Sequence, residues 1–159
     1  MTEAKFKTLR HIETVRNYSN SFIKELMMRQ EQHDQSKLQS PEVEIFEIYT
    51  PKLRECTYDS EEYRQNLKEM KIAIDHHNSF NRHHPEHFND GINGMTLIDL
   101  IEMISDWKAA SMRHNDGDIF ESIRKNKKRF GISNQLENIL INTAKWMVNQ
   151  NVFNHADES

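Results

Sequence analysis

The scarcity of glycine and proline constrains the fold of this chain more than any other feature. Its 159 residues include only four glycines, all of them after residue 90, and three prolines. Apolar residues recur at steps of three and four, the period of a helix, and no segment sustains the two-residue alternation of a strand. The sequence therefore predicts an all-α protein. At this length a single domain over residues 1–159 is expected.

The periodicity predicts a bundle of about six helices. The first is one long amphipathic helix over residues 3–31, and His11 lies on its apolar face. The second is short, begins after Ser40 with Pro41 at its first position, and ends before Pro51.

The remaining helices are predicted from their capping residues. Asp59 or Ser60 caps a helix that runs to about residue 74, and residues 78–94 have turn chemistry without a helical period, which predicts a long loop. Thr96 and Asp99 form a capping box that begins a central, mostly apolar helix. Two further helices begin at the caps Asp118 and Ser133. The sequence shows no internal repeat and no linker.

Composition excludes several classes of function. The net charge is −4 and 29% of residues are charged, so no basic field favours duplex nucleic acid. The single cysteine, Cys56, excludes an internal disulfide and fits a reducing compartment. No apolar run is long enough to cross a bilayer, and the N-terminus is polar where a signal peptide has an apolar block. The sequence predicts a cytoplasmic protein without a membrane partner.

A histidine-rich segment asks for a chemical explanation. The run DHHNSFNRHHPEHF, residues 75–88, holds five of the nine histidines of the chain. It is internal and irregular, whereas a tag lies at a terminus and repeats one letter. Within it, Glu86 either acts as a general acid or caps the turn after Pro85, and the residues alone leave both roles open.

The central helix carries a polar stripe. Asp99, Glu102, Asp106 and Arg113 share one face of a helix whose other faces are apolar. An ionised carboxylate in an apolar environment needs a cation or a metal ion as its partner. Asp106, the deepest in the apolar stretch, is therefore expected to pair with an arginine or lysine, or to bind a metal. The residues alone slightly favour the ion pair. Asp99 is explained by its capping role.

A metal site could form where helices meet. His11 alone is typical of a satisfied core residue, and the adjacent His33 and Asp34 are a pair that occurs by chance. Together with Asp106, however, they supply two imidazoles and two carboxylates on separate helices. Such a set can meet in the core of a bundle and bind one divalent ion.

The order of these residues resembles the HD-domain superfamily of metal-dependent phosphohydrolases. The resemblance is carried by His11, by the His-Asp pair at His33 and Asp34, and by Asp106 in IEMISDWKAASMR, and it covers about residues 5–115. More closely, the chain resembles a small phage and bacterial HD-like family with HDxSK and NRHHPEH motifs. The resemblance implies an HD-like helical bundle in the cytoplasm of a bacterium or a phage-infected host.

The resemblance also implies roles for individual residues. A one-metal site would use His11, His33, Asp34 and Asp106, and a second metal would recruit His77, His83 and His84. The catalytic candidates are Asp34, Lys37 and Glu86. The candidates for binding substrate are Lys37, Arg82, His87 and Arg113. The Gly-Tyr-Pro sequence of the cyclic-dinucleotide phosphodiesterase branch is replaced by GINGM, so that substrate class is not implied.

The expected function is hydrolysis of a nucleotide or related small phosphoester by water activated on a divalent metal ion. One or two ions of Mn, Fe, Co, Ni or Mg are expected, because the candidate ligands are imidazoles and carboxylates without thiolates. A homo-oligomer is compatible with the sequence. The alternative is a non-catalytic phage factor that binds a nucleotide or a protein, and a third hypothesis is a di-iron oxygenase on the same scaffold.

Overall fold

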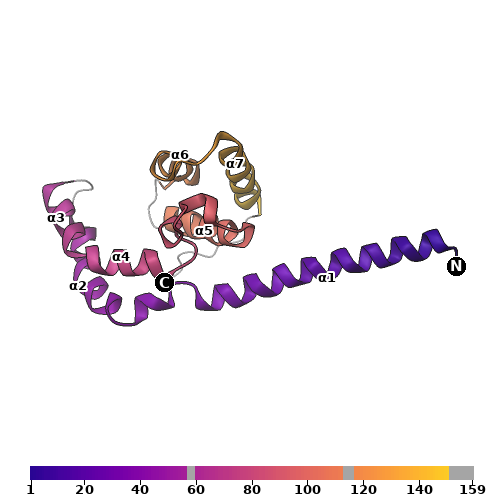
Figure 1. Cartoon of the computed structure of the whole chain (residues 1–159). Helices are drawn as coiled ribbons and strands as arrows, with labels where there is room; N and C mark the ends of the chain where they lie inside the picture. The colour runs from indigo at the N-terminus through magenta and orange to yellow at the C-terminus, as the bar shows by residue number, and fades with distance from the viewer. Residues whose placement is uncertain (57–59, 113–116, 151–159) are drawn as a thin grey trace. The chain divides into compact units, whose positions relative to one another are not determined.

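The structure is a computed structural model, and it describes residues 1–56, 60–112 and 117–150 (Figure 1). All regular secondary structure in these ranges is helical, which confirms the all-α prediction. The described residues form seven α-helices and three short 3₁₀ helices. The chain divides into two compact units, Met1–Asn81 and Arg82–Ser159, and the single domain expected from the sequence stays a prediction. We refer to them as unit 1 and unit 2.

Unit 1 begins with the predicted long helix. α1 (Glu3–Gln32) runs without a break, and the side chain of Thr2 caps it by accepting a hydrogen bond from the Lys5 backbone N–H at 3.4 Å. The 3₁₀ helix η1 (Gln35–Leu38) follows directly. In Figure 1, α1 extends away from the other helices of its own unit. No residue of α1 is buried.

The second helix is longer than predicted. α2 (Glu42–Glu55) contains Pro51 in its interior, whereas the sequence predicted an end before this residue. A proline inside a helix removes one hydrogen bond to the carbonyl four residues earlier. That carbonyl belongs to Glu47, an exposed residue that water can reach, so the helix tolerates the loss. Pro41 is the N-cap of α2 and not its first helical residue.

The third predicted helix is two helices. α3 (Glu61–Glu69) is capped by Ser60, whose hydroxyl accepts from the Tyr63 backbone N–H at 3.1 Å, while Asp59 lies outside the described residues. The buried Met70 joins α3 to α4 (Lys71–Phe80). Because α4 continues to Phe80, the first two histidines of the histidine-rich run are helical and not part of a loop.

Unit 2 contains η2 (Pro85–His87), η3 (Gly91–Gly94), α5 (Leu97–Ser111), α6 (Ile119–Phe130) and α7 (Asn134–Asn149). The segment predicted as a long loop is therefore organised by two 3₁₀ turns. The capping box of Thr96 and Asp99 is present, and Asp118 and Ser133 cap α6 and α7 as predicted. The core of this unit joins α5, α6 and α7 through Met103, Ile104, Ile119, Ile123, Ile132, Leu140 and Ala144.

None of the described helices combines the length and the apolar character that crossing a membrane requires.

Candidate functional site

The predicted His-Asp pair lies where α1 ends. His33 is the C-cap of α1, and Asp34 has left-handed backbone angles (φ 58°, ψ 9°), the only positive φ outside glycine in the described residues. Aspartate adopts this conformation at lower cost than most residues. The turn leads into η1, in which Lys37 places its Nζ 2.6 Å from Oδ2 of Asp34. The HDxSK motif thus forms a compact turn with an ion pair across it.

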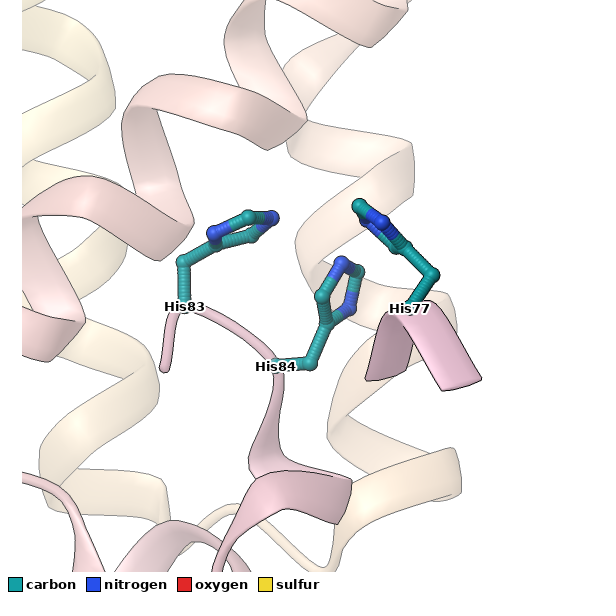
Figure 2. A group of neighbouring side chains, drawn as sticks. All are labelled: His77, His83 and His84. Carbon is teal, nitrogen blue, oxygen red and sulfur yellow. The ribbon is translucent and has the colours of Figure 1, made fainter. Parts of the chain in front are cut away.

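The Asp34 carboxylate is also surrounded by imidazoles of its own unit. Nε2 of His77 lies 3.3 Å from its Oδ1, and Nε2 of His33 lies 3.8 Å from its Oδ2. His77 comes from α4 (Figure 2) and is buried. Unit 1 by itself therefore brings together three of the predicted metal ligands, His33, Asp34 and His77.

These neighbours keep the Asp34 carboxyl ionised. Burial by itself would raise its pKa, because it disfavours the charged form. When a proton lies between Nε2 of His77 and the carboxylate, this hydrogen bond acts in the opposite direction, as do the hydrogen bond and positive charge of Lys37. Together they outweigh burial, so the pKa of Asp34 lies far below its ordinary value. Asp34 is consequently an anion at neutral pH.

Sequence reasoning missed Glu42, which holds this arrangement in place. Its carboxylate is fully buried at the start of α2. Oε2 lies 2.9 Å from Nδ1 of His77 and accepts a hydrogen bond from the Ser36 hydroxyl at 3.0 Å, while Oε1 lies 2.6 Å from Nδ1 of His76. Acidic residues are common in the first turn of a helix, so nothing in the sequence distinguished Glu42 from the exposed Glu44.

The contact with Glu42 determines how His77 presents its ring. A carboxylate only accepts, so Nδ1 of His77 carries the proton, and in the neutral ring a lone pair remains on Nε2. That lone pair and the Asp34 oxygen are both acceptors, and their 3.3 Å separation is stabilised when they share a proton or a cation. A carboxylate behind a histidine is also the usual second partner of a metal-binding imidazole. The donors therefore fit a divalent ion.

Unit 2 contains a second histidine–carboxylate cluster. His83 is buried, and its Nδ1 lies 3.2 Å from Oε1 of Glu102 on α5. The rings of His83 and His84, which precede η2 in Figure 2, have centroids 4.2 Å apart. A ring nitrogen of His83 lies within 4.8 Å of a ring nitrogen of His84 and within 4.8 Å of an Asp106 carboxylate oxygen. Within this unit, too, a carboxylate contacts Nδ1 of a buried histidine.

Two of the residues predicted to act on substrate have structural partners. The Arg82 guanidinium donates to both carboxylate oxygens of the buried Asp99, at 3.1 and 3.2 Å. Glu86, for which the sequence left the roles of general acid and of turn cap open, accepts a hydrogen bond from Arg129 of α6 at 2.7 Å. The ring of His87 packs edge-on against Phe88 with centroids 4.8 Å apart. Arg82 and Glu86 thus tie unit 2 together.

The structure does not bring His11 to the other predicted ligands of its unit. Because α1 is continuous, His11 lies about 33 Å from His33 along the helix, at 1.5 Å per residue. Its side chain is exposed and not part of a core. The sequence prediction of one long helix and the prediction that His11 joins His33 at a metal are therefore incompatible in this structure. Arg113, the last substrate-binding candidate, lies outside the described residues.

The fold and these clusters define an all-α protein with a buried histidine–carboxylate pair in each of two units. The model of a protein family of unknown function, DUF5662, matches residues 1–146, and the chain belongs to this family. No curated protein and no solved structure gives a significant match.

Proposed function

We propose that this protein is a metal-dependent phosphohydrolase on an HD-like scaffold, acting on a nucleotide or a related small phosphoester. The observation that carries the proposal is the chain of contacts from Glu42 through His77 to Asp34, at 2.9 and 3.3 Å. A buried carboxylate that orients an imidazole toward a second carboxylate is typical of a metal centre. The order of histidines and aspartates in the sequence supports the same chemistry.

The ligands are assigned for each unit separately. In unit 1, His33, Asp34 and His77 offer two imidazole nitrogens and one carboxylate. In unit 2, His83, His84 and Asp106 offer the same donor types. Imidazole and carboxylate donors without thiolate suit Mn, Fe, Co or Ni. Mg prefers oxygen ligands, so it would bind chiefly through the carboxylates. Two such sets agree with an expectation of one or two ions.

Asp34 and Lys37 have the central roles in the proposed reaction. A bound divalent ion would supply a water of lowered pKa and would polarise a phosphoryl oxygen. Asp34 is held ionised by its neighbours, so it can serve as a ligand at neutral pH. The Lys37 ammonium, 2.6 Å from Asp34, offers positive charge to a phosphoryl group beside the same carboxylate.

The proposal is tested with the purified full chain, stripped of metal and reloaded separately with Mn, Fe, Co, Ni or Mg. Each form is screened for phosphate release from nucleoside mono- and triphosphates and for hydrolysis of cyclic nucleotides. Asp34→Asn is expected to lose turnover at least a hundredfold, about the loss typical of a group that activates or positions the nucleophile. Asp75→Asn, an exposed aspartate on α4 paired with Lys71, is the matched control and should keep full activity.

Three outcomes would overturn the proposal. If no divalent metal ion binds under any loading condition, the phosphohydrolase and the oxygenase hypotheses both fail. If nucleotides bind tightly without conversion, the protein is a non-catalytic binding factor. If the iron form consumes oxygen when substrate is added, the protein is an oxygenase.

A further inference from the structure

α5 carries three carboxylates on one face, and the chain segment at the start of unit 2 runs along them. Asp99, Glu102 and Asp106 follow one another at steps of three and four residues, which places them in line along the helix. Arg82 donates to Asp99 at 3.1 and 3.2 Å. The next residue, His83, places its Nδ1 3.2 Å from Oε1 of Glu102. Consecutive residues of the segment therefore contact successive carboxylates of the helix.

The position of this segment is fixed at its first contact. Asp99 is the third residue of α5 and forms the capping box with Thr96, whose backbone N–H donates to Oδ2 of Asp99 at 2.7 Å. The Arg82 guanidinium binds the same carboxylate through two hydrogen bonds, a geometry that restrains orientation as well as distance. His83 is therefore held one residue away from a fixed point, beside the turn of α5 that carries Glu102.

The contact with Glu102 determines which nitrogen of His83 can bind an ion. An ionised carboxylate only accepts, so the 3.2 Å contact is stabilised when Nδ1 of His83 carries the proton. In the neutral ring the lone pair then lies on Nε2. A ring nitrogen of His83 also lies within 4.8 Å of a carboxylate oxygen of Asp106, about one turn further along α5. The tautomer that Glu102 favours is the one whose Nε2 can share an ion with Asp106.

We propose that Glu102 is a positioning residue of the metal site of unit 2, which holds His83 in the tautomer that offers Nε2 to the ion. The three carboxylates of α5 then have different tasks: Asp99 anchors the segment, Glu102 orients the imidazole and Asp106 binds the ion. This inference rests on the proposed function, in which His83, His84 and Asp106 are ligands. It adds a residue that acts on the ion only through His83.

The first test reads the tautomer of His83 in the metal-free full chain. Long-range proton–nitrogen NMR distinguishes a protonated from an unprotonated ring nitrogen, and the resonances of His83 are identified by their loss in His83→Gln. At a pH at which the ring is neutral, the wild type should carry its proton on Nδ1. In Glu102→Gln the side-chain amide can donate as well as accept, so this preference should be lost.

Two results of the NMR experiment would overturn the proposal. One is a proton on Nε2 of His83 in the wild type. The other is the same tautomer preference in Glu102→Gln as in the wild type, because the preference would then have another cause. The wild-type result needs no variant, so it stands even if a substitution impairs folding.

The second test measures metal affinity. Co is titrated into the metal-free full chain carrying Asp34→Asn, which removes a ligand of unit 1. Adding Glu102→Gln should raise the dissociation constant about 10- to 100-fold, the usual effect of losing the partner of a ligating imidazole. Glu137→Gln is the matched control, because Glu137 pairs with Lys127 in the same unit, and it should leave the constant unchanged. An absence of Co binding in this background, or equal constants with and without Glu102→Gln, would overturn the proposal.

The visible spectrum of bound Co separates positioning from ligation. At saturation, Glu102→Gln should keep the spectrum of its Asp34→Asn background, because no ligand is lost, whereas Asp106→Ala should change it. A change in Glu102→Gln as large as that in Asp106→Ala would make Glu102 a ligand and overturn the proposal. These measurements need no substrate. A protein that passes them but hydrolyses no phosphoester would refute the proposed function and leave this inference in place.

Discussion

Oε2 of Glu42 lies 2.9 Å from Nδ1 of His77, and Nε2 of the same imidazole ring lies 3.3 Å from Oδ1 of Asp34. One buried imidazole thus links the start of α2 to Asp34, the residue after the C-cap of α1. Ser36 adds a hydroxyl that donates to Glu42 at 3.0 Å, and Asn81 donates to that hydroxyl at 2.8 Å. One polar network thus holds together the HDxSK turn, the start of α2 and the end of α4.

Replacing Glu42 by alanine should destabilise the fold. The substitution removes the acceptor of His77 and Ser36 in a fully buried position, and stranded buried donors cost about 2–4 kcal/mol of unfolding free energy. Glu44→Ala changes an exposed residue of the same helix and should cost less than about 0.5 kcal/mol. Urea unfolding followed by circular dichroism measures both. Equal losses in the two variants would contradict the role assigned to Glu42.

The variant Glu42→Gln should weaken metal binding while the fold persists. Glutamine keeps the size of the side chain and an acceptor oxygen but loses the charge that orients His77. Loss of such a partner typically lowers metal affinity about 10- to 100-fold. Isothermal titration of the metal-free protein with Mn or Co measures the affinity, with Glu44→Gln as the matched control. An unchanged affinity would show that His77 is not a ligand or that its orientation does not depend on Glu42.

Asp34 should contribute stability that is lost in acid. Its pKa in the folded protein lies below the ordinary value of about 3.9, so the folded state favours the ionised form. The contribution is complete above that value and declines as pH falls below it. In metal-free protein, wild type should exceed Asp34→Asn in unfolding free energy at about pH 5, and the difference should shrink toward about pH 3.

Asparagine is the appropriate replacement because it also adopts the left-handed backbone conformation found at position 34. The series runs from about pH 5 to about pH 3, a range that spans the ordinary pKa of an aspartate. A difference that stays constant over this range would show that the stability does not come from ionised Asp34.

Arg82→Ala should lower stability and not only affect substrate binding. Its guanidinium makes two hydrogen bonds to the fully buried Asp99, which also makes the capping interactions with Thr96. Loss of the cation should cost about 1–3 kcal/mol. Arg124→Ala, which removes an exposed pair with Glu121, should cost under about 1 kcal/mol. Thermal unfolding compares the two variants. If Arg82→Ala is as stable as the wild type, the result would contradict the structural role and favour the substrate-binding role predicted from the sequence.

The helices were largely predictable because their signals are local. The apolar steps of α1, the capping box of Thr96 and Asp99, and the caps Asp118 and Ser133 depend on residues within a few positions of one another. Two helix ends were predicted wrongly. Pro51 remained inside α2, and α4 continued into the histidine-rich run where the sequence predicted a loop.

The sequence by itself determined the helical class, the main caps and a set of chemically plausible ligands. Only the tertiary structure decided which of them meet. It brought His77 to Asp34, left His11 about 33 Å from His33 on an unbroken helix, and engaged Glu86 with Arg129. It also identified Glu42, whose role depends on burial against α4. The physical reason is that a helix depends on residues close together in the sequence. A site depends on contacts between residues 30 or more positions apart, as Glu42 and His77 are.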